Sequence, residues 1–204
     1  MTAASLPVLA AALAVGYLLG SIPFGLVLTR SAGLGDIRAI GSGNIGATNV
    51  LRTGNKLAAL VTLIGDGAKG WLAVWLAQRL APGLGAADWA VPAAAVAVVL
   101  GHVLPGFHGF EGGKGVATGA GIVTALHWPL GLGLAALWLV MAFGFKISSL
   151  AALTAAVLMP IGAFWVFGNS PTAWAMVPIA VLLIWRHKAN IRQLLEGKER
   201  PIGR

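Results

Sequence analysis

Long apolar stretches separated by short polar segments dominate the pattern of this chain. No charged side chain occurs in residues 1–29, and further apolar stretches cover residues 57–80 and 89–105. About 20 apolar residues suffice to cross the hydrocarbon core of a bilayer. Each stretch is therefore predicted to be a transmembrane helix. The first is expected to be retained rather than cleaved, because its first basic residue, Arg30, follows the apolar run.

Two longer uncharged runs are each predicted to contain two helices. The run between Lys114 and Lys146 would measure roughly 45 Å as one helix at about 1.5 Å per residue, against a core of about 30 Å. A turn at residues 127–129 divides it more plausibly. The run 147–185 is predicted to turn at residues 168–171, which supply Gly, Asn, Ser and Pro. The pattern thus predicts an all-α integral membrane protein with about seven transmembrane helices.

The predicted fourth helix, Val116–Leu126, is short and rich in Gly and Ala. It has two interpretations: a full crossing, or a tilted, broken or partly re-entrant helix that lines a cavity.

The composition agrees with a membrane protein and limits its chemistry. Hydrophobic residues make up 58% of the chain and charged residues 10%, with a mean hydropathy of +0.86. A soluble fold could not bury that much apolar surface. No linker-like segment interrupts residues 1–204, so a single domain is expected. The chain has no cysteine, which excludes disulfides and thiolate nucleophiles, and its four scattered histidines suggest neither a metal site nor a cofactor.

The net charge of +8 takes its meaning from where the basic residues lie. If the N-terminus lies outside, seven crossings place almost all of them on the inner side and leave Arg79 outside. This asymmetry fits the positive-inside rule and argues for a membrane rather than nucleic acid as the partner. The C-terminus is then cytoplasmic. The basic residues expected inside are Arg30, Arg38, Arg52, Lys56, Lys114, Lys146, Arg186, Lys188, Arg192, Lys198, Arg200 and Arg204.

The loop after the first predicted helix is a candidate phosphate site. Its three glycines can adopt positive φ angles and turn backbone N–H groups inward as an anion nest, and Arg52 can add a bidentate charge. The same letters satisfy the dinucleotide pattern G-x-G-x-x-G, but no strand precedes them. A plain tight turn is the other alternative, against which the density of donors argues. The candidates are Gly41, Ser42, Gly43, Asn44, Gly46, Thr48, Asn49 and Arg52.

A second candidate anion site surrounds Lys114, which is framed by Gly112, Gly113 and Gly115. It is not a Walker P-loop, because Gly115 replaces the required Ser or Thr. Lys114 could simply be a basic anchor at the lipid headgroups, but that function needs no glycines. The surrounding glycines favour a lysine that approaches a phosphate closely.

Other polar residues lie near the predicted helix ends. His187 and Asn190 are three residues apart, so they share a helical face and are functional candidates. Their basic neighbours fit a headgroup anchor. Asp66 and Lys69 are predicted to form an ion pair inside the second helix, and this pair is about equally compatible with a structural and a functional role. His102 is expected to be a packed residue rather than a catalyst.

The chain resembles the bacterial acyl-phosphate-dependent glycerol-3-phosphate acyltransferases, the PlsY family. Three elements in this order carry the resemblance: segment 41–52, segment 112–115 and the motif Arg186-His187-x-x-Asn190. The resemblance covers essentially the whole chain. It implies a multi-pass enzyme of the bacterial inner membrane that acts as a monomer, with its active site facing the cytoplasm. It also implies catalytic residues, which are Ser42, Arg52, Lys114, His187, Asn190 and a serine at the start of the sixth helix. That serine is Ser148 or Ser149, and its place before Leu150 favours Ser149.

The resemblance implies that a fatty acyl group moves from acyl phosphate to the 1-position of glycerol 3-phosphate, giving lysophosphatidic acid and inorganic phosphate. Acyl phosphate is already activated, so no acyl-enzyme is needed, and neither a Gly-x-Ser-x-Gly elbow nor a His-x4-Asp dyad is present. Direct attack by the 1-hydroxyl is expected, with a substrate phosphate accepting the proton. Arg52, Lys114 and His187 would neutralise the two anions. The alternative is a transporter for a phosphorylated metabolite, against which the lack of duplicated halves argues.

Overall fold

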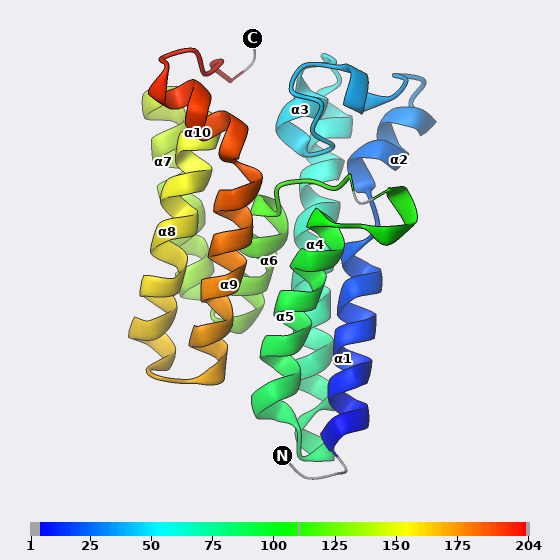
Figure 1. Ribbon diagram of the computed structural model, residues 1–204, viewed down its shortest axis with the longest axis vertical. Helices are drawn as coiled ribbons and strands as arrows, with labels where there is room; N and C mark the ends of the chain where they lie inside the picture. The colour runs from blue at the N-terminus through cyan, green and yellow to red at the C-terminus, as the bar shows by residue number, and fades with distance from the viewer. Residues whose placement is uncertain (1–4, 110, 203–204) are drawn as a thin grey trace.

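The computed structural model describes residues 5–109 and 111–202, so Arg204, one of the basic residues expected inside, lies outside the described residues. The described residues form a bundle of helices joined by short loops (Figure 1). Three short 3₁₀ helices cover Ile37–Ala39, Pro82–Leu84 and Gly106–His108. The α-helices are α1 (Ser5–Gly20), α2 (Phe24–Ser31), α3 (Ala47–Leu51), α4 (Lys56–Leu80), α5 (Ala87–Val103), α6 (Val116–Leu126), α7 (Trp128–Phe145), α8 (Ser148–Phe167), α9 (Pro171–Arg186) and α10 (Lys188–Leu195).

Each of the seven expected apolar segments contains a helix. Four segments are long and apolar enough to cross a membrane, and α5, α6 and α9 are shorter apolar helices. Both long uncharged runs are divided where the turn residues predicted it. His127 Nδ1 caps α7 by accepting from the N–H of Leu130 at 3.3 Å, and Ser170 Oγ caps α9 by accepting from the N–H of Ala173 at 3.3 Å. The side chains at these turns therefore satisfy backbone groups that the new helix leaves free.

The first apolar run differs from the expected single helix, because it breaks between α1 and α2. Pro23 has no N–H and disfavours a helical conformation at Ile22. The carbonyl of Ile22 instead accepts a hydrogen bond from Lys69 Nζ at 2.9 Å. Lys69 also pairs with Asp66, with Nζ and Oδ1 3.0 Å apart and both side chains buried. The predicted ion pair is thus confirmed, and its lysine satisfies the broken backbone.

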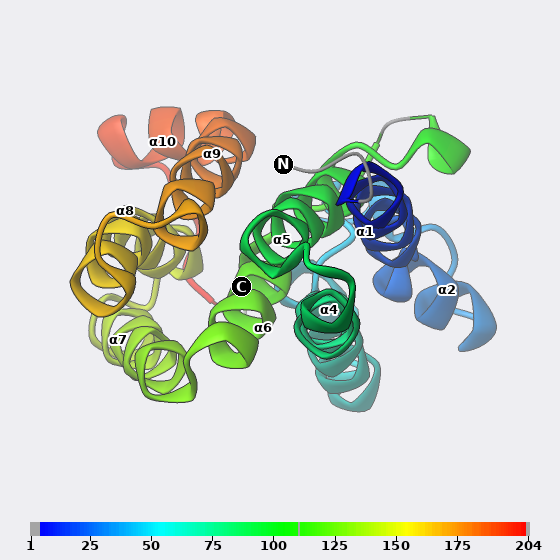
Figure 2. The ribbon, with the colours of Figure 1, turned by 90° about the horizontal axis from the view of Figure 1, so that it is seen from below.

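Small residues let neighbouring helices approach closely. A Cβ atom on Gly20 of α1 would collide with the carbonyl oxygen of Val98 in α5, and one on Gly121 of α6 would collide with that of Gly67 in α4. Lipid supplies no hydrophobic force between helices, so such close packing stabilises the bundle directly. Viewed along its length, the bundle has α6 between a group containing α1, α4 and α5 and a group containing α7, α8 and α9 (Figure 2).

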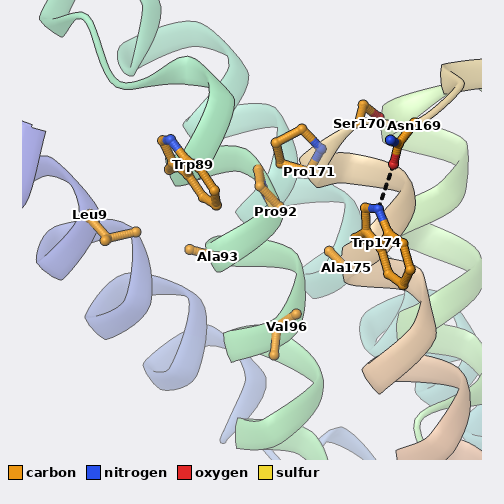
Figure 3. A pocket seen from close by; sticks show the side chains of 10 residues that line it. All are labelled: Leu9, Trp89, Pro92, Ala93, Val96, Asn169, Ser170, Pro171, Trp174 and Ala175. Carbon is orange, nitrogen blue, oxygen red and sulfur yellow. Dashed lines mark hydrogen bonds between the residues drawn. The ribbon is translucent and has the colours of Figure 1, made fainter. Parts of the chain in front are cut away.

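The two ends of the bundle differ in polarity. Helices α2, α3 and α10 gather at one end of the bundle, and α1 begins at the other, its N-terminal end (Figure 1). Near the N-terminal end, side chains from α1, α5 and α9 line a groove of 520 Å³ (Figure 3). Trp174 Nε1 donates to Asn169 Oδ1 there at 2.7 Å, and none of the described residues that line the groove is charged. The candidate polar residues lie at the opposite end.

Candidate functional site

A cavity of 620 Å³ lies at the end where α2, α3 and α10 gather. Its polar lining comes from the loop around α3, the residues before α6, the start of α8 and the segment that follows α9, together with the buried Asp66 of α4 and His102 of α5. The remaining lining is mostly apolar. Three predicted site residues, Gly43, Gly112 and Gly113, are not part of the lining. The predicted residues that line it are Gly41, Ser42, Asn44, Gly46, Thr48, Asn49, Arg52, Lys114, Gly115, Ser149, His187 and Asn190. Four distant segments thus meet at one cavity.

Asn49 organises the loop around α3. The residue is 2% exposed, and its Nδ2 lies 3.1, 2.9 and 2.8 Å from the carbonyls of Ile37, Ile40 and Asn44, so that its two protons are shared among three acceptors. Its Oδ1 accepts from the N–H of Ser42 at 3.0 Å. These bonds use the amide to fold the loop, so Asn49 shapes the cavity wall from beneath.

The backbone of this loop only partly matches the expected anion nest. Gly41 and Gly43 have positive φ angles of 57° and 69°, as predicted. Gly46 has a φ of −78°, and its N–H donates to Asn44 Oδ1 at 3.0 Å. The N–H of Ser42 is also occupied, by Asn49. The N–H of Gly43 donates to the carbonyl of Ile40 at 2.9 Å. Three N–H groups that could have bound an anion are therefore used within the loop, and the charge of Arg52 becomes the main attraction for an anion.

Arg52 has a buried donor that lacks an acceptor within the described part of the chain. Its Nη1 donates to Asn49 Oδ1 at 3.3 Å, while its Nε is buried and bonds to no acceptor among the described residues. A buried donor left without an acceptor costs about 1–3 kcal/mol, and more when it is charged. Gly41 provides room for this side chain, because a Cβ atom there would lie 2.8 Å from Arg52 Cδ. An anionic ligand would complete the hydrogen bonding of the guanidinium.

The glycines beside Lys114 have a packing function. A Cβ atom on Gly112 would collide with the carbonyl oxygen of His102, and one on Gly113 with the imidazole of His102. Arg186 fastens the same loop, because its Nη2 donates to the carbonyl of Gly112 at 2.6 Å and its Nε to that of Gly113 at 3.1 Å. The two glycines therefore hold the loop against α5 and α9, and Lys114 alone of these three residues lines the cavity.

Lys114 is partly desolvated within the cavity wall. Its Nζ donates to Asn190 Oδ1 at 2.6 Å. Burial lowers the pKa of Lys114 to about 8, helped by the positive charges of Arg52 and Arg186 and opposed by Glu199. The lysine is thus cationic at neutral pH, and its charge is weakly screened because little water surrounds it.

His187 follows α9 and is buried, with 3% of its surface exposed. Burial lowers the pKa of His187 to about 4, so the ring is neutral at neutral pH and does not add the positive charge expected of it. Its Nδ1 lies 2.7 Å from the carbonyl oxygen of Leu183. Since a carbonyl only accepts, this contact assigns the ring proton to Nδ1 and leaves Nε2 as an acceptor.

Ser149 joins the same network through a residue that nothing in the sequence singles out. Its Oγ donates to Glu199 Oε1 at 2.8 Å, and Asn190 Nδ2 donates to the same oxygen at 2.7 Å. Ser148 also lines the cavity, but Ser149 is the more buried of the two. The geometry therefore favours Ser149 as the site serine and adds Glu199 and Arg186 to the residues that build the site.

Comparison with known sequences gives a consistent picture. A family model described as glycerol-3-phosphate acyltransferase matches residues 10–197. The glycerol-3-phosphate acyltransferase of Ralstonia nicotianae is 56% identical over 187 residues, which cover 92% of this chain and 90% of that protein. The one from Burkholderia ambifaria is 54% identical over 191 residues, which cover 93% and 88% of the two chains.

Two crystal structures share the fold. Both are of PlsY (YgiH), described as an integral membrane glycerol 3-phosphate acyltransferase. Its glycerol 3-phosphate form is 36% identical, with a TM-score of 0.88 and 95% of each chain covered. Its lysophosphatidic acid form is 35% identical, with a TM-score of 0.84 and 94% of each chain covered.

Proposed function

This chain belongs to the glycerol-3-phosphate acyltransferase family, and from that premise we propose that it transfers a fatty acyl group from acyl phosphate to the 1-position of glycerol 3-phosphate. The products are lysophosphatidic acid and inorganic phosphate, which makes this the first step of bacterial phospholipid synthesis. One observation carries the proposal: Arg52 and Lys114 line the same cavity, and the part of its wall formed by α6, α7 and α8 is mostly apolar. Such a cavity suits two phosphorylated reactants, one of which has an acyl chain.

The chain is an integral membrane protein, and its charges support one orientation. Arg30, Lys146 and Arg186 lie at the end of the bundle that holds the cavity, whereas Arg79 lies near the other end. By the positive-inside rule the cavity faces the cytoplasm and the N-terminus lies outside. We propose seven crossings of the bacterial inner membrane by a single domain that acts as a monomer.

The apolar wall is the proposed site of the acyl chain. It is formed by α6, α7 and α8, with Val123, Leu134 and Met159 among its residues. Met159 lies ten positions along α8 from Ser149, which corresponds to roughly 15 Å at about 1.5 Å per residue. An acyl chain along this wall places its carbonyl carbon near Ser149 and Lys114.

The two substrates are both anions, and their repulsion is the main obstacle to reaction. Two unit charges 4 Å apart repel by about 4 kcal/mol at an effective dielectric constant of about 20, and phosphates bring more than one charge each. Arg52 supplies a planar fork of donors and Lys114 a compact charge to offset this repulsion. The cavity thereby holds the reactants together, which removes much of the entropic barrier.

The chemical step is a direct displacement. The 1-hydroxyl oxygen attacks the acyl carbonyl carbon, the bond from that carbon to the phosphate oxygen breaks, and a phosphate oxygen of a substrate accepts the hydroxyl proton. The charge that develops on the carbonyl oxygen lies near the lysine. No acyl-enzyme forms, because the leaving phosphate already activates the carbonyl.

Purified protein in detergent provides the direct test. With acyl phosphate and glycerol 3-phosphate both present, inorganic phosphate and lysophosphatidic acid should appear in equal amounts. Reactions without glycerol 3-phosphate correct for spontaneous hydrolysis of acyl phosphate. A transporter for phosphorylated metabolites would release no phosphate beyond this blank, and that result would refute the proposed reaction.

The pKa of Lys114 predicts how acyl transfer depends on pH. Lys114 is protonated below a pKa of about 8, so its attraction for phosphate is present at neutral pH and is lost as the pH rises through about 8. His187, with a pKa of about 4, adds no transition in this range. On the acid side, a phosphate monoester changes charge near pH 6. We therefore expect kcat/KM to be level around pH 7 and to fall above about 8.

The pH profile has a matched variant. Arginine stays charged throughout this range, so Lys114→Arg should remove the fall above about pH 8 in whatever activity it retains. A wild-type kcat/KM that stays level to pH 9.5, after subtraction of the blank, would contradict the assignment of this ionisation to Lys114.

A further inference from the structure

Glu199 lies at the centre of the hydrogen bonds that join the site. It belongs to the segment after α10, which runs across the same end of the bundle as α3 (Figure 1). The segment is held there by a hydrogen bond from the N–H of Ile202 to the carbonyl of Lys146 at 2.7 Å. Oε1 of Glu199 accepts from both Ser149 and Asn190. The segment thus carries a carboxylate into a cavity proposed to bind anions, which needs an explanation.

The direction of each hydrogen bond in this network is fixed by chemistry. Lysine only donates and an ionised carboxylate only accepts. Asn190 must therefore present its carbonyl oxygen to Lys114 and its NH₂ group to Glu199. Ser149 has one proton, and it is used on Glu199, so Ser149 can only accept further hydrogen bonds. A phosphate also only accepts, so this serine is turned away from phosphate recognition.

We propose that Glu199 is a positioning residue whose carboxylate holds the proton of Ser149, so that Ser149 accepts a hydrogen bond from a hydroxyl of glycerol 3-phosphate. The same carboxylate keeps the carbonyl of Asn190 turned to Lys114. This inference rests on the proposed function, since it names the group that Ser149 recognises. It explains why an acidic residue reaches an anion site: Glu199 contacts the neutral donors Ser149 and Asn190, and both substrate phosphates remain with Arg52 and Lys114.

Two substitutions separate the acceptor from the charge. Glu199→Ala removes the acceptor, and kcat/KM for glycerol 3-phosphate should fall about 10- to 100-fold, the size of a lost charge-assisted hydrogen bond. Glu199→Gln keeps a carbonyl oxygen, so it should remain within about threefold of wild type. The KM for acyl phosphate should change less than about twofold in either variant. The matched control is Glu196→Gln, an exposed tail glutamate paired with Arg192 and Lys198, which should behave as wild type.

A double-mutant cycle tests whether Glu199 acts through Ser149. Once Ser149→Ala is in place, adding Glu199→Ala should cost less than it does in the wild-type background, because the part of its effect that acts through Ser149 is already lost and only the part through Asn190 remains. The Kd for glycerol 3-phosphate, measured by calorimetry without acyl phosphate, should rank the variants in the same order as their kcat/KM values. Melting temperatures in detergent establish that each variant is folded.

Three results would overturn the proposal. The first is a kcat/KM of Glu199→Ala that equals that of wild type, and the second is a kcat/KM of Glu199→Gln as low as that of Glu199→Ala. The third is a loss in the double variant that equals the product of the losses caused by Glu199→Ala and Ser149→Ala alone. The second result would instead make the negative charge itself the important property. If wild-type protein binds glycerol 3-phosphate but releases no phosphate from acyl phosphate, the proposed reaction fails, and the binding series still decides the role of Glu199.

Discussion

Lys114→Ala is expected to lower kcat/KM for acyl transfer about 10²- to 10³-fold, which is the usual loss when a preorganised donor is removed from an active site. The substitution leaves Arg52 to offset the charges of two phosphorylated reactants by itself. It also removes the hydrogen bond that Lys114 Nζ donates to Asn190 Oδ1. The loop should keep its position, because Arg186 holds it through the carbonyls of Gly112 and Gly113. Steady-state kinetics in detergent measure the loss, and a thermal melt checks the fold.

The matched control for this prediction is Lys188→Ala. Lys188 lies at the same end of the bundle but is exposed and does not line the cavity. Its removal takes away one positive charge near the membrane surface and should leave kcat/KM within about twofold. Equal losses in the two variants would show that the general basic charge of this end matters, rather than a specific contact of Lys114.

The helices could be predicted from the sequence because the bilayer sets both their length and their composition. The excess length of the run between Lys114 and Lys146 was enough to predict the turn at residues 127–129. The break before α2 is not evident from the apolar pattern, although Pro23 is visible, because prolines are tolerated in membrane helices when a neighbour satisfies a backbone carbonyl that the break leaves without a helical partner. That neighbour is Lys69, 47 residues away in sequence from Ile22, so local pattern could not reveal it.

The sequence predicts which residues of the polar loops form the site, but only partly what each of them does there. Glycines next to donors indicate a close approach of backbone, but the sequence does not say what approaches. At Gly113 it is the ring of His102, and at Gly41 it is the side chains of Asn49 and Arg52. Short-range pattern therefore locates a tightly packed site, whereas the partner at each glycine depends on the tertiary fold.

Glu199 and Arg186 show what sequence pattern leaves out. Arg186 stands in a basic segment after a membrane helix, which is typical of a headgroup anchor, and its hydrogen bonds to the Lys114 loop span more than 70 residues. Glu199 stands in a tail of mixed charge, where a solvated side chain is the ordinary expectation. Both act through partners that only the packed helices bring near. The motif Arg186-His187-x-x-Asn190 marks Arg186 without indicating those partners, and Glu199 carries no local signal.

Arg52→Ala is the second variant for which a large loss is expected, again about 10²- to 10³-fold in kcat/KM, because the planar fork that binds a phosphate is lost. Arg52→Lys should recover only part of the activity, since an ammonium keeps the charge but cannot donate in two parallel directions. The matched control is Arg38→Ala, from the same loop. Arg38 is engaged by Asp36 and Glu111 and does not line the cavity, so its loss should change kcat/KM less than about twofold.

The melting temperature separates function from folding for Arg52. Its Nε is buried without an acceptor among the described residues, so removing the side chain relieves a desolvation cost while it breaks only the 3.3 Å contact with Asn49. Activity should therefore fall sharply while the melting temperature in detergent stays level or rises. Glycerol 3-phosphate should raise the melting temperature of wild type more than that of Arg52→Ala, because a ligand stabilises only the form it binds. A variant that melts several degrees lower and loses activity in proportion would contradict an anion-binding role, since Arg52 would then be supporting the loop rather than the ligand.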